Sequence, residues 1–273
     1  MTEIKIENEH VFRDVDTSGV APHLIAYLEA VAALPEVRAV HEITAAMLDA
    51  QPGERVLEVG CGLGADAREL AERVLPAGEV VAIDLSKAMV EAARERHDER
   101  LPVTYDVADV TALPYDDASF DVVRIERVLQ HVPDAALACR EIARVLKPGG
   151  RVLAYDTDWG SFSVSIADTA LAERCLAHIA GRFINRRAGL DQRAYLARAG
   201  LDAATVTPHA FVYTSLAQAA VPVPMLNDQL PPEADFVPLA DRDAWFAAVE
   251  AADADGTLVV AWNGYSVLAR KPS

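Results

Sequence analysis

A short run of the chain combines alternating glycines with an acid, a pattern suited to holding a small charged ligand. Residues 56–66 read VLEVGCGLGAD, so Gly60, Gly62 and Gly64 follow directly on an apolar stretch that carries Glu58. Glycine has no side chain, so the backbone of such a loop can approach a ligand closely. The amide N–H groups at the start of a following helix would attract a negatively charged ligand group.

Three carboxylates narrow the choice of ligand. The loop also fits the dinucleotide pattern Gly-x-Gly-x-x-Ala, with Asp84 about 20 residues further on, where a ribose-binding acid belongs. S-adenosylmethionine (SAM) would use the same loop and the same acid. Glu58 favours SAM, because a carboxylate is unfavourable beside a pyrophosphate and favourable beside the ammonium of a methionine moiety. Asp109, which closes a third apolar run, can accept from an adenine amino group.

These residues fall at the ends of apolar runs that alternate with helical patterns. Strands are expected at 55–60, 79–84, 103–109, 120–126 and 151–156, and helices at 65–75, 86–97 and 134–146. Continuous apolar runs suit strands that are buried on both faces, and strand–helix alternation predicts a mostly parallel α/β sheet. Ligands of such sheets bind at the carboxyl ends of the strands.

The flanking parts of the chain have different patterns. Residues 20–50 predict two helices broken near Leu34-Pro35. Beyond residue 156 we expect helices at 168–181, 191–199 and 241–252 and long strands at 201–214 and 257–271. The proline-rich stretch 221–238 has no regular period, so we interpret it as an irregular insertion and a candidate lid.

Five segments together resemble the class I SAM-dependent methyltransferases, and within them the ubiquinone/menaquinone methyltransferase-like small-molecule enzymes. They are VLEVGCGLGAD, VVAIDLSKAMV, ADVTALPYDDASFDVV, ERVLQHVPD and REIARVLKPGGRVL, in family order over about residues 50–156. The resemblance implies a Rossmann-like, seven-stranded, mostly parallel sheet with helices on both faces, an antiparallel last strand and an N-terminal helical cap. We expect one domain, residues 1–273, made of a cap (1–50), a SAM-binding core (51–156) and a substrate-side part (157–273).

The resemblance also assigns cofactor contacts by position. Asp84 would bind the ribose, Leu85 would lie against the adenine, and Asp109 with the Val110 backbone would hold the adenine edge. Many family members have a small polar residue where this chain has Glu126. The full set of implied SAM-binding residues is Glu58, Gly60, Cys61, Gly62, Gly64, Asp84, Leu85, Met89, Asp109, Val110 and Glu126.

Few residues are candidates for the chemistry itself, because methyl transfer from a sulfonium depends largely on positioning. His131, in ERVLQHVPD at the carboxyl edge of the sheet, is the candidate general base, since imidazole titrates near neutral pH. The alternative is that His131 only orients its loop. Candidate substrate contacts are His23 and Tyr27, on one helix face, and Asp158 and Trp159, after the fifth strand.

Composition excludes several other partners. The net charge is −17, so nucleic acid and an anionic membrane surface are poor partners. The N-terminus lacks the apolar core of a signal peptide, and no run of apolar residues is long enough to span a bilayer. The three cysteines and the remaining histidines lack metal-ligand spacing, so we expect no metal and a reducing, cytoplasmic setting. Arg186 and Arg187 could bind a substrate carboxylate, although a solvated helix end is the simpler expectation.

The sequence therefore predicts a methyltransferase that uses SAM, gives S-adenosylhomocysteine and methylates O, N or C of a small organic molecule, in natural-product or quinone-type metabolism. The methyl acceptor stays open, as does the choice between monomer and homodimer. One alternative is a methyltransferase-fold enzyme that binds SAM but catalyses another reaction, such as a cyclisation. A nicotinamide-dependent oxidoreductase and a non-catalytic interaction module are weaker alternatives.

Overall fold

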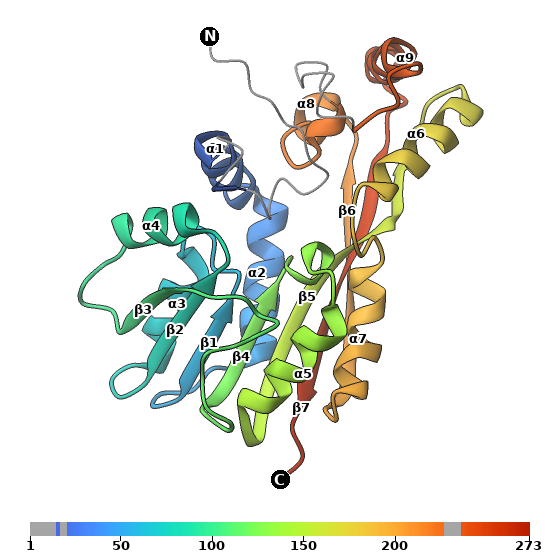
Figure 1. Ribbon diagram of the computed structural model, residues 1–273. Helices are drawn as coiled ribbons and strands as arrows, with labels where there is room; N and C mark the ends of the chain where they lie inside the picture. The colour runs from blue at the N-terminus through green and yellow to red at the C-terminus, as the bar shows by residue number, and fades with distance from the viewer. Residues whose placement is uncertain (1–14, 17–20, 227–235) are drawn as a thin grey trace.

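A seven-stranded sheet forms the centre of the protein (Figure 1). The computed structural model describes residues 15–16, 21–226 and 236–273. The strand order is β3-β2-β1-β4-β5-β7-β6; β1 to β5 are parallel, and β7 is antiparallel to both of its neighbours. The predicted sheet, with its antiparallel last strand, is confirmed. The strands are β1 (Arg55–Val59), β2 (Glu79–Asp84), β3 (Val103–Val107), β4 (Phe120–Glu126), β5 (Leu146–Val164), β6 (Asp202–Tyr213) and β7 (Val260–Arg270).

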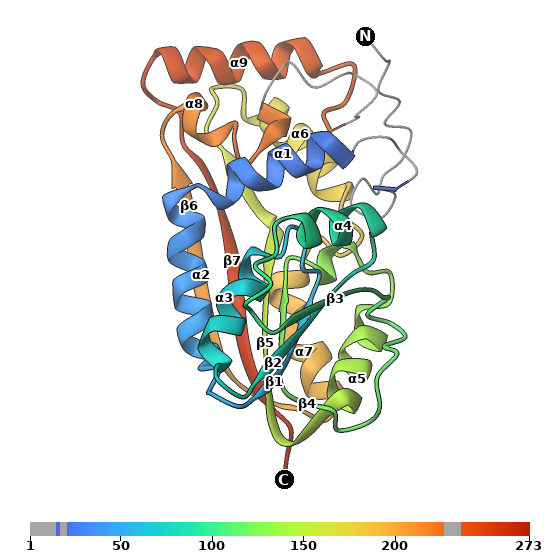
Figure 2. The ribbon, with the colours of Figure 1, turned by 90° about the vertical axis from the view of Figure 1, so that its left-hand side faces the viewer.

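Helices lie on both faces of the sheet and above one end of it (Figures 1 and 2). They are α1 (Ala21–Ala32), α2 (Pro35–Leu48), α3 (Ala65–Val74), α4 (Lys87–Glu95), α5 (Ala135–Val145), α6 (Thr169–Gly181), α7 (Ala188–Arg198), α8 (Leu216–Ala219) and α9 (Arg242–Ala254), with 3-10 turns η1 (Leu129–His131) and η2 (Pro224–Leu226). The sequence did not predict α8 or the two turns. Within the described ranges, no helix has the length and apolar character needed to cross a membrane.

Helix starts follow the capping residues that the sequence offers. Ser86 Oγ accepts from the Met89 amide at 3.2 Å, and Asp134 Oδ1 accepts from the Leu137 amide at 2.8 Å. Each bond satisfies an amide that has no partner inside its helix. Pro35 occupies the first turn of α2, where a missing N–H costs nothing, so the chain breaks between α1 and α2 as expected.

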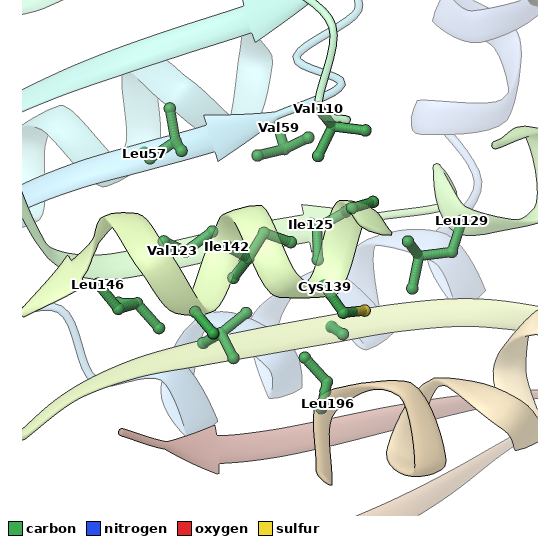
Figure 3. Close-up of a cluster of buried hydrophobic side chains, with 14 of the residues drawn as sticks. Leu57, Val59, Val110, Val123, Ile125, Leu129, Cys139, Ile142, Leu146 and Leu196 are labelled. Carbon is green, nitrogen blue, oxygen red and sulfur yellow. The ribbon is translucent and has the colours of Figure 1, made fainter. Parts of the chain in front are cut away.

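The core is divided between the two faces because neighbouring side chains on a strand point in opposite directions. On β1, Val56 packs with residues of α3 and α4, whereas Leu57 packs with residues of α5. Figure 3 shows the cluster on the α5 face of the sheet, in which Leu57, Val123 and Ile142 come together from β1, β4 and α5. Packing on both faces of the sheet fixes where β1 and β4 end, at its carboxyl edge.

The fifth strand is much longer than predicted. Instead of spanning 151–156, β5 runs from Leu146 to Val164 and pairs with β7 through most of that length. The prediction that Asp158 and Trp159 follow the strand is therefore wrong: both lie inside it, beside a shift in pairing register between Asp158 and Ser163. The second half of this strand was not predicted because the polar and glycine residues in TDWGSFSV break the apolar run.

The far ends of β5, β6 and β7 carry an upper layer formed by α6, α8 and α9 (Figure 1). Phe162, Phe211 and Trp262 are buried there, and the Phe211 and Trp262 rings stack with centroids 5.1 Å apart. Helix α1 passes beneath α9 and above α4 (Figure 2). The upper layer and α1 thus face the carboxyl ends of the parallel strands.

Candidate active site

A cavity of about 1400 Å³ lies at the carboxyl edge of the sheet. It is reached by the ends of β1 and β4, the neighbouring strands between which the strand order reverses, and such a switch point is where open α/β sheets bind ligands. Sites for one small molecule usually measure roughly 300–1,000 Å³, so this cavity has room for two. Among the described residues, no group of three or more His, Cys, Asp or Glu side chains is arranged to hold a metal ion.

The structure brings nearly all of the predicted site residues together around this cavity. Every cofactor and substrate candidate lines it except Gly64 and Asp158. Gly64 is the N-cap of α3 with φ of 72°, and a Cβ there would lie 2.7 Å from Tyr105 Cε1. Asp158 is buried, and its Oδ1 accepts from the Gly160 amide at 3.1 Å. Arg186 and Arg187 are exposed and lie outside the lining.

The proline-rich stretch is described only at its two ends. Residues 227–235, the centre of the candidate lid, lie outside the described residues. Pro222, Pro224, Met225 and Phe236 line the cavity. The Tyr27 hydroxyl donates to the Pro222 carbonyl at 3.2 Å, so α1 and this stretch are joined above the cavity.

The glycine loop is held tightly against its neighbours. The amides of Gly60 and Cys61 both donate to the Ile83 carbonyl, at 2.8 and 2.9 Å. A Cβ at Gly60, where φ is 73°, would overlap Val128. Glycine is therefore required there for both backbone conformation and space. The Cys61 thiol is buried, which raises its pKa, so this cysteine acts as a small apolar residue.

Two acids lie where the resemblance places the adenosine part of a cofactor. Asp84 Oδ2 accepts from the Gly62 amide at 3.0 Å and its Oδ1 from the Ser86 amide at 2.9 Å. Burial raises the pKa of Asp84, and these two bonds oppose that rise. Asp109 lies two residues beyond the end of β3, and its Oδ1 accepts from the amide and hydroxyl of Thr111. Both carboxylates are thus fixed by local bonds at the rim of the cavity.

A buried ion network occupies the ends of β1 and β4, and the sequence analysis missed its central residue. The side chain of Arg124 is only 3% exposed. Its Nη1 lies 2.7 Å from Glu58 Oε1 and 3.0 Å from Asp66 Oδ2, and its Nη2 bonds Glu126 Oε2. A charge inside the apolar run FDVVRIE was the available signal, because buried arginines almost always pair with acids.

His41 joins the second helix to this network. Its Nδ1 lies 3.2 Å from Asp66 Oδ1 and its Nε2 lies 2.8 Å from Glu126 Oε1. Burial lowers the pKa of His41, but the two carboxylates outweigh it and raise the pKa to about 10. The folded pKa exceeds the unfolded one, so this contact stabilises the fold fully below about pH 6.5 and is lost as pH rises through 10.

Glu58 has a free oxygen for a ligand. Its side chain is 2% exposed; Oε1 bonds Arg124, whereas Oε2 is buried without a hydrogen-bond partner among the described residues. Burial raises the pKa of Glu58 to about 8, although Arg124 lowers it. A buried oxygen without a donor is costly, and a cationic donor in the cavity would remove that cost. Glu58 therefore fits the ammonium group of SAM.

His131 lines the cavity at the end of η1, and other residues fix its turn. Asn185 Nδ2 donates to the carbonyls of Leu129 and Val132, at 2.7 and 2.6 Å. The Gln130 amide donates to Asp156 Oδ2 at 3.2 Å. These bonds shape the turn that places His131 at the wall of the cavity.

Trp159 also lines the cavity, but one face of its ring is already covered. It stacks on Phe183, with centroids 4.1 Å apart and planes 9° apart. Its Nε1 donates to Gln130 Oε1 at 2.6 Å. The prediction that Trp159 stacks on an aromatic substrate stays a prediction, and only its other face is available for it.

The strand order, the antiparallel last strand and the acid-flanked glycine loop at the switch point define the class I SAM-dependent methyltransferase fold. Residues 57–154 match the protein family described as a methyltransferase domain. This part of the chain is thus similar to methyltransferase domains, and the fold around it is the class I SAM-dependent methyltransferase fold.

Two relatives show how far the likeness extends. An uncharacterised protein of 37.1 kDa in a Streptomyces fradiae transposon is 36% identical over 232 residues, which is 83% of this chain and 66% of that protein. A demethylmenaquinone methyltransferase of Staphylococcus aureus is 41% identical over 105 residues, 38% of this chain and 44% of that enzyme. The chain thus spans less than two thirds of either relative.

Solved structures share the fold across most of the chain. Phosphoethanolamine N-methyltransferase 2 of Haemonchus contortus superposes with a TM-score of 0.61 at 20% identity, covering 98% of this chain and 61% of that one. The cyclase SpnF gives a TM-score of 0.57 at 24% identity, covering 86% and 81%. Likeness at these identities extends to the fold alone.

Proposed function

We propose that this protein is a methyltransferase that binds SAM in the glycine-loop half of the cavity and methylates a small organic molecule in the other half. The observation that carries the proposal is that Glu58 Oε2, buried beside the glycine loop, has no hydrogen-bond partner in the described part of the chain. A pyrophosphate would be repelled there, whereas an ammonium would be bonded. The volume of the cavity supports a second ligand.

Named residues would hold the cofactor by its two ends. Glu58 would pair with the ammonium, and Gly60 and Gly62 would let the backbone approach the methionine part. Asp84 would accept from the ribose hydroxyls, and Leu85 with Asp109 would border the adenine. Glu126 is already hydrogen-bonded to Arg124 and ion-paired with His41, so we assign it to positioning Glu58 through Arg124 rather than to contact with SAM.

Bound SAM would supply an electrophilic methyl group. The chain's own residues would align the acceptor, exclude water and take a proton from a hydroxyl or amine acceptor. We assign the removal of that proton to His131, because this residue lines the cavity on a turn that hydrogen bonds from Asn185 and to Asp156 hold in place.

Removing the Asp84 carboxylate should weaken SAM binding. We expect Asp84→Ala to cost about 1.5–3 kcal/mol of binding free energy, the range for hydrogen bonds to a charged group. Isothermal titration calorimetry with SAM and S-adenosylhomocysteine measures it. Asp116→Ala, an exposed residue outside the cavity lining, is the matched control. Equal SAM affinity for wild type and Asp84→Ala would defeat the assignment, and tight NADH binding would favour a dinucleotide enzyme.

The pH dependence of SAM affinity tests Glu58. In the free protein its raised pKa of about 8 keeps it mostly neutral at lower pH, whereas an ammonium favours the ionised form. Binding should therefore release a proton, so affinity should rise with pH, by up to tenfold per unit between about pH 6 and 8, and then fall as the α-amino group of SAM, of ordinary pKa about 7.7–8.0, loses its proton. Titrations in buffers of different ionisation enthalpy report the released proton. Glu58→Gln should flatten the profile; a wild-type affinity independent of pH would contradict this role.

A further inference from the structure

The half of the cavity away from the glycine loop has aromatic walls. We define the aromatic chamber as the lining contributed by β5, β6, β7 and the segments beside the upper layer. Its residues are Tyr155, Thr157, Trp159, Arg182, Phe183, Phe211, Pro222, Pro224, Met225, Phe236 and Trp262. Large aromatic surfaces favour a flat, apolar ligand, because ring contacts add to the gain from burying apolar area.

Among the described residues that line this chamber, Arg182 is the charged one and none is a carboxylate. A protonated amine buried there would lose its hydration without gaining an anionic partner, which is strongly unfavourable. The chamber therefore selects against cationic acceptors, even though the chain as a whole carries a net charge of −17.

Arg127 lies where the chamber meets the cofactor half of the cavity. It follows β4 directly and lines the cavity, and its amide donates to the Tyr155 carbonyl of the chamber at 2.8 Å. The next residue, Val128, packs against Gly60 of the glycine loop. Burial raises the pKa of the Tyr27 hydroxyl, and the nearby positive charge of Arg127 opposes that rise.

The backbone of Arg127 is held in an unusual conformation. Its φ is 54°, in the left-handed region that residues with side chains seldom occupy. Such strain persists where surrounding structure enforces it, and it clusters at functional sites. Here the bond from the Arg127 amide to Tyr155 fixes the turn, so the strained conformation carries a cation to the cavity wall.

The guanidinium of Arg127 is only loosely engaged by the protein. Its Nε lies 3.5 Å from Glu126 Oε1, an oxygen that His41 contacts more closely, at 2.8 Å. The other Glu126 oxygen bonds Arg124. The terminal nitrogens of Arg127 make no hydrogen bond to any described residue. Arg127 thus presents a fork of donors, matched to an oxyanion, at the entrance to an apolar chamber.

We propose that the methyl acceptor is a flat, mostly apolar aromatic molecule with an acidic oxygen group, a carboxylate or an acidic hydroxyl, which pairs with Arg127 while its rings occupy the aromatic chamber. The proposal rests on the proposed function in calling this ligand the methyl acceptor, but the binding preference itself does not require methyl transfer. The site should select aromatic compounds that carry an acidic oxygen group, and Arg127 should not recognise an amine.

Three probes with the same ring system test the preference: 2-naphthoate, 2-naphthalenemethanol and 2-naphthylmethylamine. Calorimetry at neutral pH, with and without saturating S-adenosylhomocysteine, gives their affinities for the full chain. We expect 2-naphthoate to bind about tenfold or more tighter than the alcohol, as for a hydrogen bond to a charged group, and the amine to bind most weakly.

Variants separate Arg127 from the general charge of the protein. Arg127→Met should remove the advantage of 2-naphthoate and leave the affinity for 2-naphthalenemethanol within about twofold, and Arg127→Lys should retain part of the advantage. Arg186→Met, an exposed arginine outside the cavity lining, should bind all three probes as wild type does. Circular dichroism and affinity for S-adenosylhomocysteine establish that each variant is folded.

If the wild-type protein binds the three probes equally, or binds the amine most tightly, the proposal is overturned and no variant is needed. Retention of the full 2-naphthoate advantage by Arg127→Met would overturn the role of Arg127. Failure to bind S-adenosylhomocysteine would instead defeat the proposed function, and the probe preference would still be measured in the free protein.

Discussion

Arg124→Met should lower the free energy of unfolding by about 3–5 kcal/mol, because it leaves several buried carboxylates facing one another without their shared cation. Glu58, Asp66 and Glu126 all lie within 3.0 Å of the Arg124 guanidinium. Two further cations touch this cluster among the described residues: His41 contacts Asp66 and Glu126, and Arg127 lies 3.5 Å from Glu126. Denaturation in urea, followed by circular dichroism at neutral pH, measures the loss.

The control for this prediction is Arg73→Met. Arg73 forms an ion pair with Glu69 at 2.7 Å, but both side chains are more than a third exposed. Exposed pairs of this kind contribute about 0.2–1 kcal/mol, so the control should lose little stability. A loss for Arg124→Met no larger than that of the control would mean that the buried ion network does not hold β1, β4 and α3 together.

His131→Ala should lower kcat by about 10²–10⁴-fold while SAM binds as before, if His131 takes the proton from the acceptor. Its turn is already shaped by Asn185, which bonds the carbonyls of Leu129 and Val132. Loss of the ring should therefore remove proton transfer without moving the turn. Transfer of a labelled methyl group to an acceptor, at saturating SAM, gives the rates.

Asn185→Ala is the variant that separates the two roles of this turn. It should distort the loop, so kcat and the affinity for the acceptor should change together. If His131→Ala instead weakens SAM binding and changes kcat little, His131 only orients its loop. Unchanged turnover and binding would exclude both roles.

The sequence predicted the parallel half of the sheet and its glycine loop because those signals are local. Ser86 and Asp134 mark helix starts within four residues of the amides that they cap, Glu58 lies one residue before the end of an apolar run, and Asp84 ends another. The carboxyl ends of parallel strands then meet at one edge whatever the details of packing. The cofactor candidates could therefore be placed around one cavity from the sequence alone.

The missed residues depend on contacts between distant parts of the chain. His41 lies on α2, more than 80 positions before its partner Glu126, and no spacing rule connects them. Arg124 was visible as a charge inside an apolar strand, but its three partners were not. Phe183 belongs to a segment without periodicity, so its stacking on Trp159 could not be foreseen. Pairings of this kind are set by tertiary packing rather than by local propensity.

The position of β7 has a consequence for how the chain folds as it is synthesised. This strand follows β6 in the sequence, yet it lies between β5 and β6 in the sheet (Figure 1). Until residues 260–270 leave the ribosome, β6 has no neighbour in the sheet, and Val152 has no Ala269 with which to pair. Closing a loop of roughly a hundred residues is slow compared with forming local contacts. The glycine-loop half should therefore be assembled first, and the wall formed by β5, β7 and β6 should be completed only after residues 260–270 have emerged.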